Sequence, residues 1–292
     1  MEEKTLEDLY LEIKSYKKES IKFYGICIAS IITFFITMGF LISDNTSTPA
    51  VTIFGILTVM LLGYIFWLSK VKSNNKMNLK SKLVNYFLSS RKSENKRVLY
   101  LPEGNMKKDF VNSNIYNEYN NLFFTDQINI GTKFKISNTL AVYKTDESRV
   151  VKFDGVFVCI QNDEFYENEI IIKPDFENKY VSNLAISKDK LLGNDSQKVY
   201  LENSEFEKYF EVYSKNQVKA RELITPKYMD DLLNIKFKLG VPIKIIYKGD
   251  MKYIAIWNKK ILNDKVIFKK NLDLKALKDD FNYIIDACED II

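Results

Sequence analysis

The 292-residue chain contains no histidine, and this absence removes several classes of protein at once. A Ser–His–Asp triad, a Cys–His dyad, an HExxH zinc site and a histidine-ligated haem all need an imidazole from the chain. The three cysteines, Cys27, Cys159 and Cys288, lie far apart and form no CxxC pair. They offer neither a four-cysteine zinc site nor a disulfide framework, so we expect no metal and no cofactor.

Glycine and proline are also scarce, with ten and five residues, which excludes a collagen-like chain or a flexible linker. Neither GxGxxG nor GxxxxGKS/T occurs, so no phosphate-binding loop is indicated. A composition of 46% hydrophobic and 28% charged residues is typical of a folded chain. The net charge of +5 is too small to indicate nucleic-acid binding.

Two long stretches without a charged residue lie near the N-terminus. Residues 23–42 and 51–68 are uncharged runs of 20 and 18 residues, which as helices would be about 30 and 27 Å long and match a bilayer core. The alternatives are a buried helical hairpin in a soluble core and a signal peptide. A signal peptide, however, has a basic start and a shorter apolar run. The lengths therefore predict a transmembrane helical hairpin.

The flanks of the two runs predict the orientation. Three lysines precede the first run within residues 17–22, five lie within residues 70–82, and the connecting loop has no Lys or Arg. The positive-inside rule then places both termini in the cytoplasm of a multi-pass cell-membrane protein. We expect Tyr24, Trp67, Lys70 and Lys72 at the inner interface with the lipid bilayer. Neither run contains an ionisable side chain, which favours an anchor over a pore or transporter subunit.

Beyond the second run, charge and periodicity change. Residues 70–108 carry eleven Lys and Arg against two acidic residues, and apolar residues at three- and four-residue spacing predict amphipathic helices over 2–22 and 77–90. The expected parts are a cytoplasmic helix (1–22), the two spans (23–42 and 51–68) with an extracytoplasmic turn (43–50), a basic juxtamembrane helix or linker (69–95), and a cytoplasmic domain (96–292).

The cytoplasmic domain shows short strand patterns mixed with helices and no regular βαβ alternation, so we predict an α+β fold. Strands are expected over 138–143, 149–161, 169–173, 198–201 and 210–213. Residues 241–247 and 252–257 flank Lys248-Gly249-Asp250, which indicates a hairpin. Thr225 and Pro226 begin a helix that Gly240 ends, and residues 273–291 form the C-terminal helix.

The segment Glu205–Leu233 is the densest in aromatic and charged residues. It contains EFE (205–207), FEVY (210–213), AR (220–221) and TP (225–226), and upstream lie DQINIG (126–131) and FDGVF (153–157). In these motifs the chain from about Val98 onwards, with its paired spans, resembles the bacterial family catalogued as domain of unknown function 3137. The resemblance implies a membrane-anchored bacterial protein and supplies no reaction.

Arg221 is the residue we single out, because the chain has only four arginines among its 43 basic residues. A planar fork that binds two oxygens at once is a physical reason to keep arginine where lysine is otherwise used. We expect a buried pair with a carboxylate or with backbone carbonyls, and an anionic ligand is the alternative. The candidate structural or interaction residues are Arg221, Glu222, Tyr213, Phe206 and Phe210.

These observations leave three hypotheses. A membrane-anchored interaction, scaffold or regulatory domain, with a protein partner or self-association, explains the anchor and the missing catalytic motifs. A membrane-bound enzyme using carboxylate or Ser–Lys chemistry would need a polar cleft with shifted pKa values. A pore or transporter subunit is disfavoured by the uncharged spans. The sequence leans against an enzyme and identifies no catalytic residue.

Overall fold

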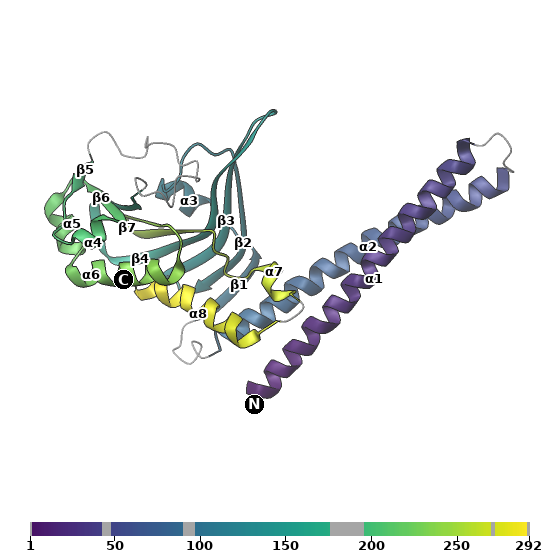
Figure 1. Ribbon diagram of the computed structural model, residues 1–292, viewed down its shortest axis with the longest axis horizontal. Coiled ribbons are helices and arrows are strands. Elements are labelled where there is room, and N and C mark those ends of the chain that lie inside the picture. Colours follow the sequence, from purple (N-terminus) through teal and green to yellow (C-terminus); the bar gives the residue numbers. More distant parts are fainter. Residues whose placement is uncertain (1, 43–47, 90–96, 176–195, 270–271, 291–292) are drawn as a thin grey trace. The chain divides into compact units, whose positions relative to one another are not determined.

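The computed structural model describes residues 2–42, 48–89, 97–175, 196–269 and 272–290 (Figure 1). The chain divides into two compact units. The first consists of Met1–Val84 and Asp264–Leu274, and the second of Asn85–Asn263 and Lys275–Ile292.

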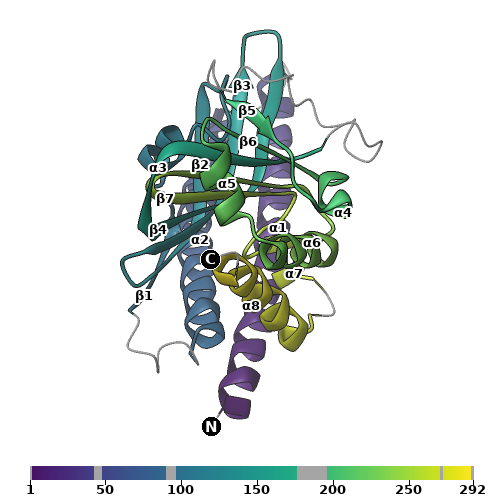
Figure 2. The ribbon, with the colours of Figure 1, turned by 90° about the vertical axis from the view of Figure 1, so that its left-hand side faces the viewer.

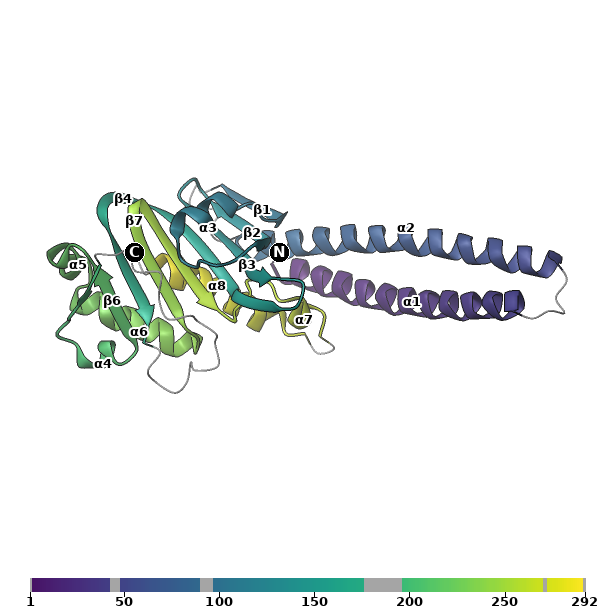
Figure 3. The same ribbon diagram turned by 90° about the horizontal axis from the view of Figure 1, so that it is seen from above.

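Two long helices, α1 (Glu2–Ile42) and α2 (Thr48–Phe87), form most of the first unit. They lie side by side (Figures 1 and 3) and are antiparallel, because Glu12 pairs with Lys82 at 2.6 Å and Thr37 hydrogen-bonds Thr58 at 3.2 Å. Both are long and apolar enough to cross a membrane, and only 11% and 6% of their most apolar windows are buried. Core helices of soluble proteins are buried on at least one face, so the buried-hairpin alternative does not fit.

The helices run without a break through the expected boundaries at residues 22 and 68. Most of the expected turn, at 43–47, lies outside the described residues, as do 90–96 of the expected linker. The amphipathic pattern near the end of α2 is confirmed, since Leu79, Leu83 and Phe87 are buried. Lys80 in this stretch is also buried, and its ammonium pairs with Asp264 at 2.6 Å.

A segment from the far end of the chain completes the first unit. Helix α7 (Asp264–Ile267) brings Asp264 to Lys76 and Lys80 of α2. The Phe268 ring lies 4.8 Å from the ring of Tyr16 on α1. The stem of the helical hairpin is thus tied to residues more than 180 positions later in the chain, as the 188-residue separation of Lys76 and Asp264 shows.

The second unit is built on a seven-stranded antiparallel sheet, β1-β2-β3-β4-β6-β5, with β7 paired to β4. Two long strands organise the sheet: β4 pairs with β3 and β6 at opposite ends of one edge, and β7 runs along the other edge. The strands are β1 (Val98–Glu103), β2 (Asn121–Ile130), β3 (Phe134–Lys144), β4 (Arg149–Pro174), β5 (Gln197–Val199), β6 (Phe210–Ser214) and β7 (Ile243–Trp257).

Helices cover both faces of this sheet. Helix α3 (Lys107–Ser113) contributes Phe110 to a core with Phe153 and Phe157 of β4. On the other face lie α6 (Pro226–Leu239) and α8 (Leu274–Asp290), side by side (Figures 1 and 2). The remaining short helices are α4 (Ser204–Glu207) and α5 (Gln217–Leu223). Two apolar helices followed by an antiparallel sheet with helices confirm the α+β class.

The expected hairpin at Lys248-Gly249-Asp250 is wrong. Residues 243–257 form one continuous strand, β7, and Gly249 lies inside it at φ +60°. The left-handed conformation that favours glycine in a turn also favours it at a β-bulge. Here the pairing with β4 decides between them, since the register shifts between Gln161↔Met251 and Ile170↔Tyr247. The two strands expected over 149–161 and 169–173 are likewise parts of one strand, β4, because β4 pairs with β7 on both sides of the irregular region.

The expected helix ends follow local rules and are confirmed. Thr225 caps α6 by accepting a hydrogen bond from the Tyr228 amide at 3.2 Å, with Pro226 in the first turn. Gly240 ends the helix at φ +65°. The C-terminal helix covers 274–290, against the expected 273–291.

Candidate functional site

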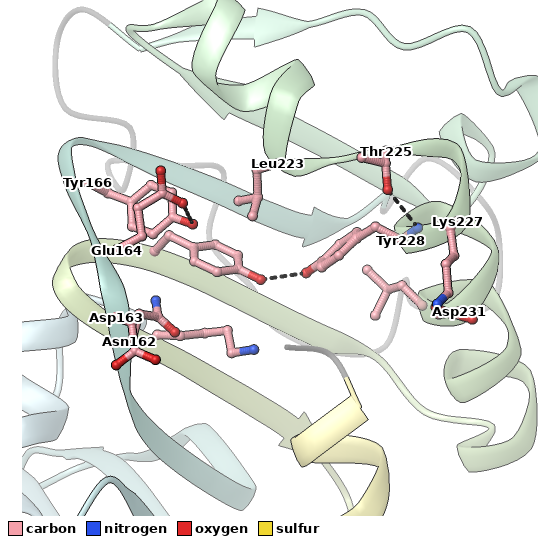
Figure 4. Close-up of a pocket in the computed structure, with 12 residues that line it drawn as sticks. Asn162, Asp163, Glu164, Tyr166, Leu223, Thr225, Lys227, Tyr228 and Asp231 are labelled. Carbon is pink, nitrogen blue, oxygen red and sulfur yellow. Dashed lines mark hydrogen bonds between the residues drawn. The ribbon is translucent and has the colours of Figure 1, made fainter.

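A pocket of about 430 Å³ opens in the second unit, beside the bulge of β7 (Figure 4). Four elements line it: the bulged part of β4, the end of α5, α6 with its capping residue, and β7. The lining residues are Asn162, Asp163, Glu164, Tyr166, Leu223, Thr225, Lys227, Tyr228, Asp231, Leu232, Tyr247 and Lys252. The lining thus combines carboxylates, hydroxyls and ammonium groups with a leucine wall, as polar ligand sites do.

The bulge brings two of these side chains together. Alternate residues of a strand point to opposite faces, so Tyr247 and Lys252, five positions apart, would face opposite ways in a regular strand. The pairing with β4 is irregular here, and the left-handed backbone of Gly249 reverses the alternation within β7. Tyr247 and Lys252 consequently line the same pocket.

The start of helix α6 positions a second tyrosine, Tyr228, at the pocket. Because Thr225 and Pro226 fix the first turn, Tyr228 reaches from α6 toward β7 (Figure 4), and its hydroxyl hydrogen-bonds that of Tyr247 at 3.0 Å. The ring of Tyr166 on β4 lies 5.2 Å from that of Tyr247. Burial raises the pKa of all three phenols, so they stay protonated near neutral pH; Tyr166 donates its hydrogen to Glu164, and Tyr228 and Tyr247 share one hydrogen bond.

Lys252 lies fully buried in the lining. Its burial disfavours the ammonium form and lowers the pKa to about 7, and the neighbouring Cys288 of α8 opposes this lowering. Burial in turn raises the pKa of the Cys288 thiol to about 12. The burial of Lys252 favours the neutral amine, and an anion placed beside it would favour the charged form.

Two of the three carboxylates at the pocket already have cationic partners. Glu164 pairs with Lys219 of α5 and accepts a hydrogen bond from Tyr166 at 2.9 Å, and both contacts lower its pKa. Asp163 pairs with Lys133. The remaining charged groups of the lining are two lysines, Lys227 and Lys252, and one carboxylate, Asp231.

The aromatic residues singled out in the sequence lie elsewhere. Phe206 and Phe210 are buried, and their rings stack at 5.1 Å, so they serve the core. Tyr213 is half-buried, and its hydroxyl donates to Glu211 at 3.2 Å. Glu211 in turn pairs with Lys173 and Lys198. A role for these residues in binding stays a prediction.

Arg221 differs from the expectation of a buried, doubly paired fork. It is exposed on α5, and its Nε donates one 3.4 Å hydrogen bond to the backbone carbonyl of Tyr200. Glu222 is also exposed and lies 3.5 Å from Lys219. The side chain of Arg221 points away from the core because it occupies the solvent side of a helix whose buried residue is Ala220.

Two sequence motifs have structural explanations. The Asp126 carboxylate of DQINIG is buried and accepts hydrogen bonds from Tyr100 at 2.7 Å and Asn138 at 3.0 Å. Gly155 of FDGVF lies against β7, where an added Cβ would approach the carbonyl oxygen of Ile256 to 2.0 Å. Both motifs therefore fix strands of the sheet.

Sequence reasoning missed Tyr166, Tyr228, Tyr247 and Lys252. The one available signal was a lysine amid the apolar residues of MKYIAIW (251–257). A lysine at an inward strand position is rare, because lysine is almost never fully buried unless it is paired. Among the residues that the structure describes, no group of His, Cys, Asp and Glu could hold a metal ion.

Comparisons with known proteins give a family and little else. A solved structure similar to this chain is that of the mycobacterial trehalose monomycolate transport factor A, TtfA, with 9% identity and a TM-score of 0.35 over 72% of this chain and 93% of that chain. A likeness this weak carries no argument about function. No curated protein matches the chain. Residues 151–292 match the family model "Protein of unknown function (DUF3137)", which supports the family that the sequence motifs resemble.

Proposed function

We propose that this chain is a bacterial integral membrane protein with both termini in the cytoplasm, and that its sheet domain is a regulatory module that binds a small anionic ligand. The anchor is supported by the two apolar, mostly unburied helices and by the basic residues that flank them. The regulatory role rests on the pocket between β4, α6 and β7, because a scaffold without a ligand needs no such site.

The donors of the pocket indicate the class of ligand. The hydroxyls of Tyr228 and Tyr247, joined by one hydrogen bond, and the amino groups of Lys227 and Lys252 belong to the lining. Leu223 and Leu232 form the apolar wall. A small carboxylate or phosphate ester with an apolar body would satisfy both parts of the lining. Its negative charge would raise the pKa of Lys252, so binding would strengthen as the pH falls from 8 to 6.

The test is a thermal-shift screen of the full chain in detergent against small carboxylates and phosphate esters. A hit should stabilise the protein more at pH 6 than at pH 8. Tyr228→Phe should weaken the shift, while Tyr143→Phe, at an exposed site on β3, should not. If every stabilising compound acts equally on Tyr228→Phe, the pocket is not the ligand site.

A membrane-bound enzyme is the second candidate, and the pKa of Lys252 near 7 favours it. An amine that is half-deprotonated at neutral pH can act as a general base or a nucleophile. The described lining contains no serine, so the pocket supports an amine mechanism over a Ser–Lys pair. Incubation with glyoxylate and cyanoborohydride, followed by peptide mapping, should modify Lys252 faster than the half-exposed Lys248 if the amine is reactive and reachable.

The orientation is tested by cysteine labelling. In a background without the native cysteines, a cysteine at Ser47 should react with an impermeant thiol reagent in intact cells, and one at Ser196 should not. Labelling at Ser196 alone would invert the topology.

A further inference from the structure

A second cavity lies in the first unit, between α1 and α2. It is a groove of about 280 Å³ whose lining includes Lys22, Phe23 and Ile26 of α1 and Leu68 and Lys72 of α2. Phe23 is the first residue of one uncharged run and Leu68 is the last residue of the other. The antiparallel packing brings these two boundaries together, so the groove lies where apolar helix surface gives way to charged surface.

The charge of the groove is mostly positive. The lining contains two lysines, Lys22 and Lys72, and one acidic side chain, Glu19. In the part of the chain that the structure describes, neither lysine forms an ion pair. The ammonium of Lys72 instead lies 4.8 Å from the ring centroid of Phe23 and 4.7 Å from that of Tyr24. These cation–π contacts hold the charge at the groove without neutralising it.

The floor of the groove is apolar. We give this name to the apolar lining residues Phe23, Ile26, Leu68 and Val71. Tyr64 also lines the groove, with its ring stacked 5.9 Å from that of Trp67. Tyrosine and tryptophan are the residues that favour the headgroup level of a bilayer. A free phosphate ion would use the two ammonium groups and leave this floor uncovered, whereas a lipid covers both.

We infer that the groove binds an anionic glycerophospholipid, with its phosphate at Lys22 and Lys72 and the first part of an acyl chain on the apolar floor. This inference rests on the proposed membrane anchor. Basic pockets between transmembrane helices on the cytoplasmic side are suited to anionic headgroups. A zwitterionic lipid carries no net charge to balance the two lysines, so the groove should discriminate between the two lipid classes.

The experiment uses the full chain, purified in a mild detergent and exchanged into mixtures of phosphatidylglycerol and phosphatidylcholine, with retained lipids counted by native mass spectrometry. Lys22→Gln/Lys72→Gln removes both charges from the groove. Lys18→Gln/Lys70→Gln is the matched control, because it removes two exposed lysines at the same level of the two helices, outside the groove lining.

The unmodified chain and the control should retain phosphatidylglycerol in preference to phosphatidylcholine. The groove variant should lose this preference, by about fivefold in affinity for each lysine removed. An equal loss in the control would mean general attraction to anionic lipid and would overturn the inference. Equal retention of both lipids by the unmodified chain, or competition by glycerol phosphate at the same affinity as the lipid, would also overturn it.

A carbonate wash of native membranes separates this inference from the anchor on which it rests. If the unmodified chain is released by the wash, the proposed anchor is wrong. If the chain stays in the membrane but shows no lipid preference, the anchor stands and the groove is not a lipid site.

Discussion

Lys252 should make the stability of the sheet domain depend on pH in an unusual direction. Its pKa is about 7 in the folded protein, where burial disfavours the charge, against 10.5 for an ordinary lysine. Below pH 7 both the folded and the unfolded chain hold the proton. Between pH 7 and 10.5 the unfolded chain binds more protons, so the free energy of unfolding rises with pH.

The size of the rise follows from the two pKa values. Between pH 7 and pH 9 it is about 2 kcal/mol. The window ends at pH 9 because the thiols of Cys159 and Cys288, whose pKa burial raises to about 12 from 9.0, contribute the opposite slope as the pH approaches and passes 9. The buried tyrosines add to that opposite slope from about pH 10.

The assay is urea unfolding of the full chain in detergent at pH 7, 8 and 9, followed by near-ultraviolet circular dichroism. Lys252→Met should remove most of the rise. Lys248→Met is the matched control, since Lys248 lies on the same strand, is 35% exposed and pairs with Glu169, and it should keep the rise. If the unmodified protein shows no increase from pH 7 to 9, or if Lys252→Met keeps it, the burial argument for Lys252 is refuted.

Three further outcomes are expected, each read as a change in the unfolding midpoint. Gly155→Ala should destabilise the domain by about 3 kcal/mol, since the added Cβ would lie 2.0 Å from the carbonyl oxygen of Ile256; an unchanged midpoint would mean that the two strands can separate freely. Thr225→Ala should cost about 1 kcal/mol through the lost helix cap, and Thr225→Ser should restore it. Arg221→Ala should cost about 1 kcal/mol or less, because one long hydrogen bond from an exposed side chain is lost; a loss of several kcal/mol would restore the buried fork that the sequence indicated.

The parts of the fold that the sequence predicted are those decided within a few residues. The uncharged runs at 23–42 and 51–68 need only a count, and the start of α6 needs only Thr225 and Pro226 in succession. These features give the same result whatever the rest of the chain does, because capping and side-chain hydrophobicity act locally.

The misread parts are those decided by a distant partner. Gly249 satisfies the requirements of a hairpin turn and of a bulge equally well, since both need a positive φ. The choice depends on β4, which pairs with both halves of β7 and so keeps them in line. The expectation of a buried pair at Arg221 differs from the structure for another reason. A scarce residue type indicates a buried pair only where its side chain points inward, and the sequence did not show which side of α5 Arg221 occupies.

The same bulge explains why the candidate site was not visible in the sequence. The site needs Tyr247 and Lys252 on one face, and regular alternation puts them on opposite faces. It also needs Tyr228, which Thr225 and Pro226 place from a helix that begins more than 20 residues before Lys252. The TP motif of the family segment thus has a use beyond ending a loop: by fixing the first turn of α6 it aims a phenol at the face that the bulge of β7 has rearranged. Tyr228, Tyr247 and Lys252 therefore come together through the positions of α6 and β7 in the fold, and no single sequence motif contains them.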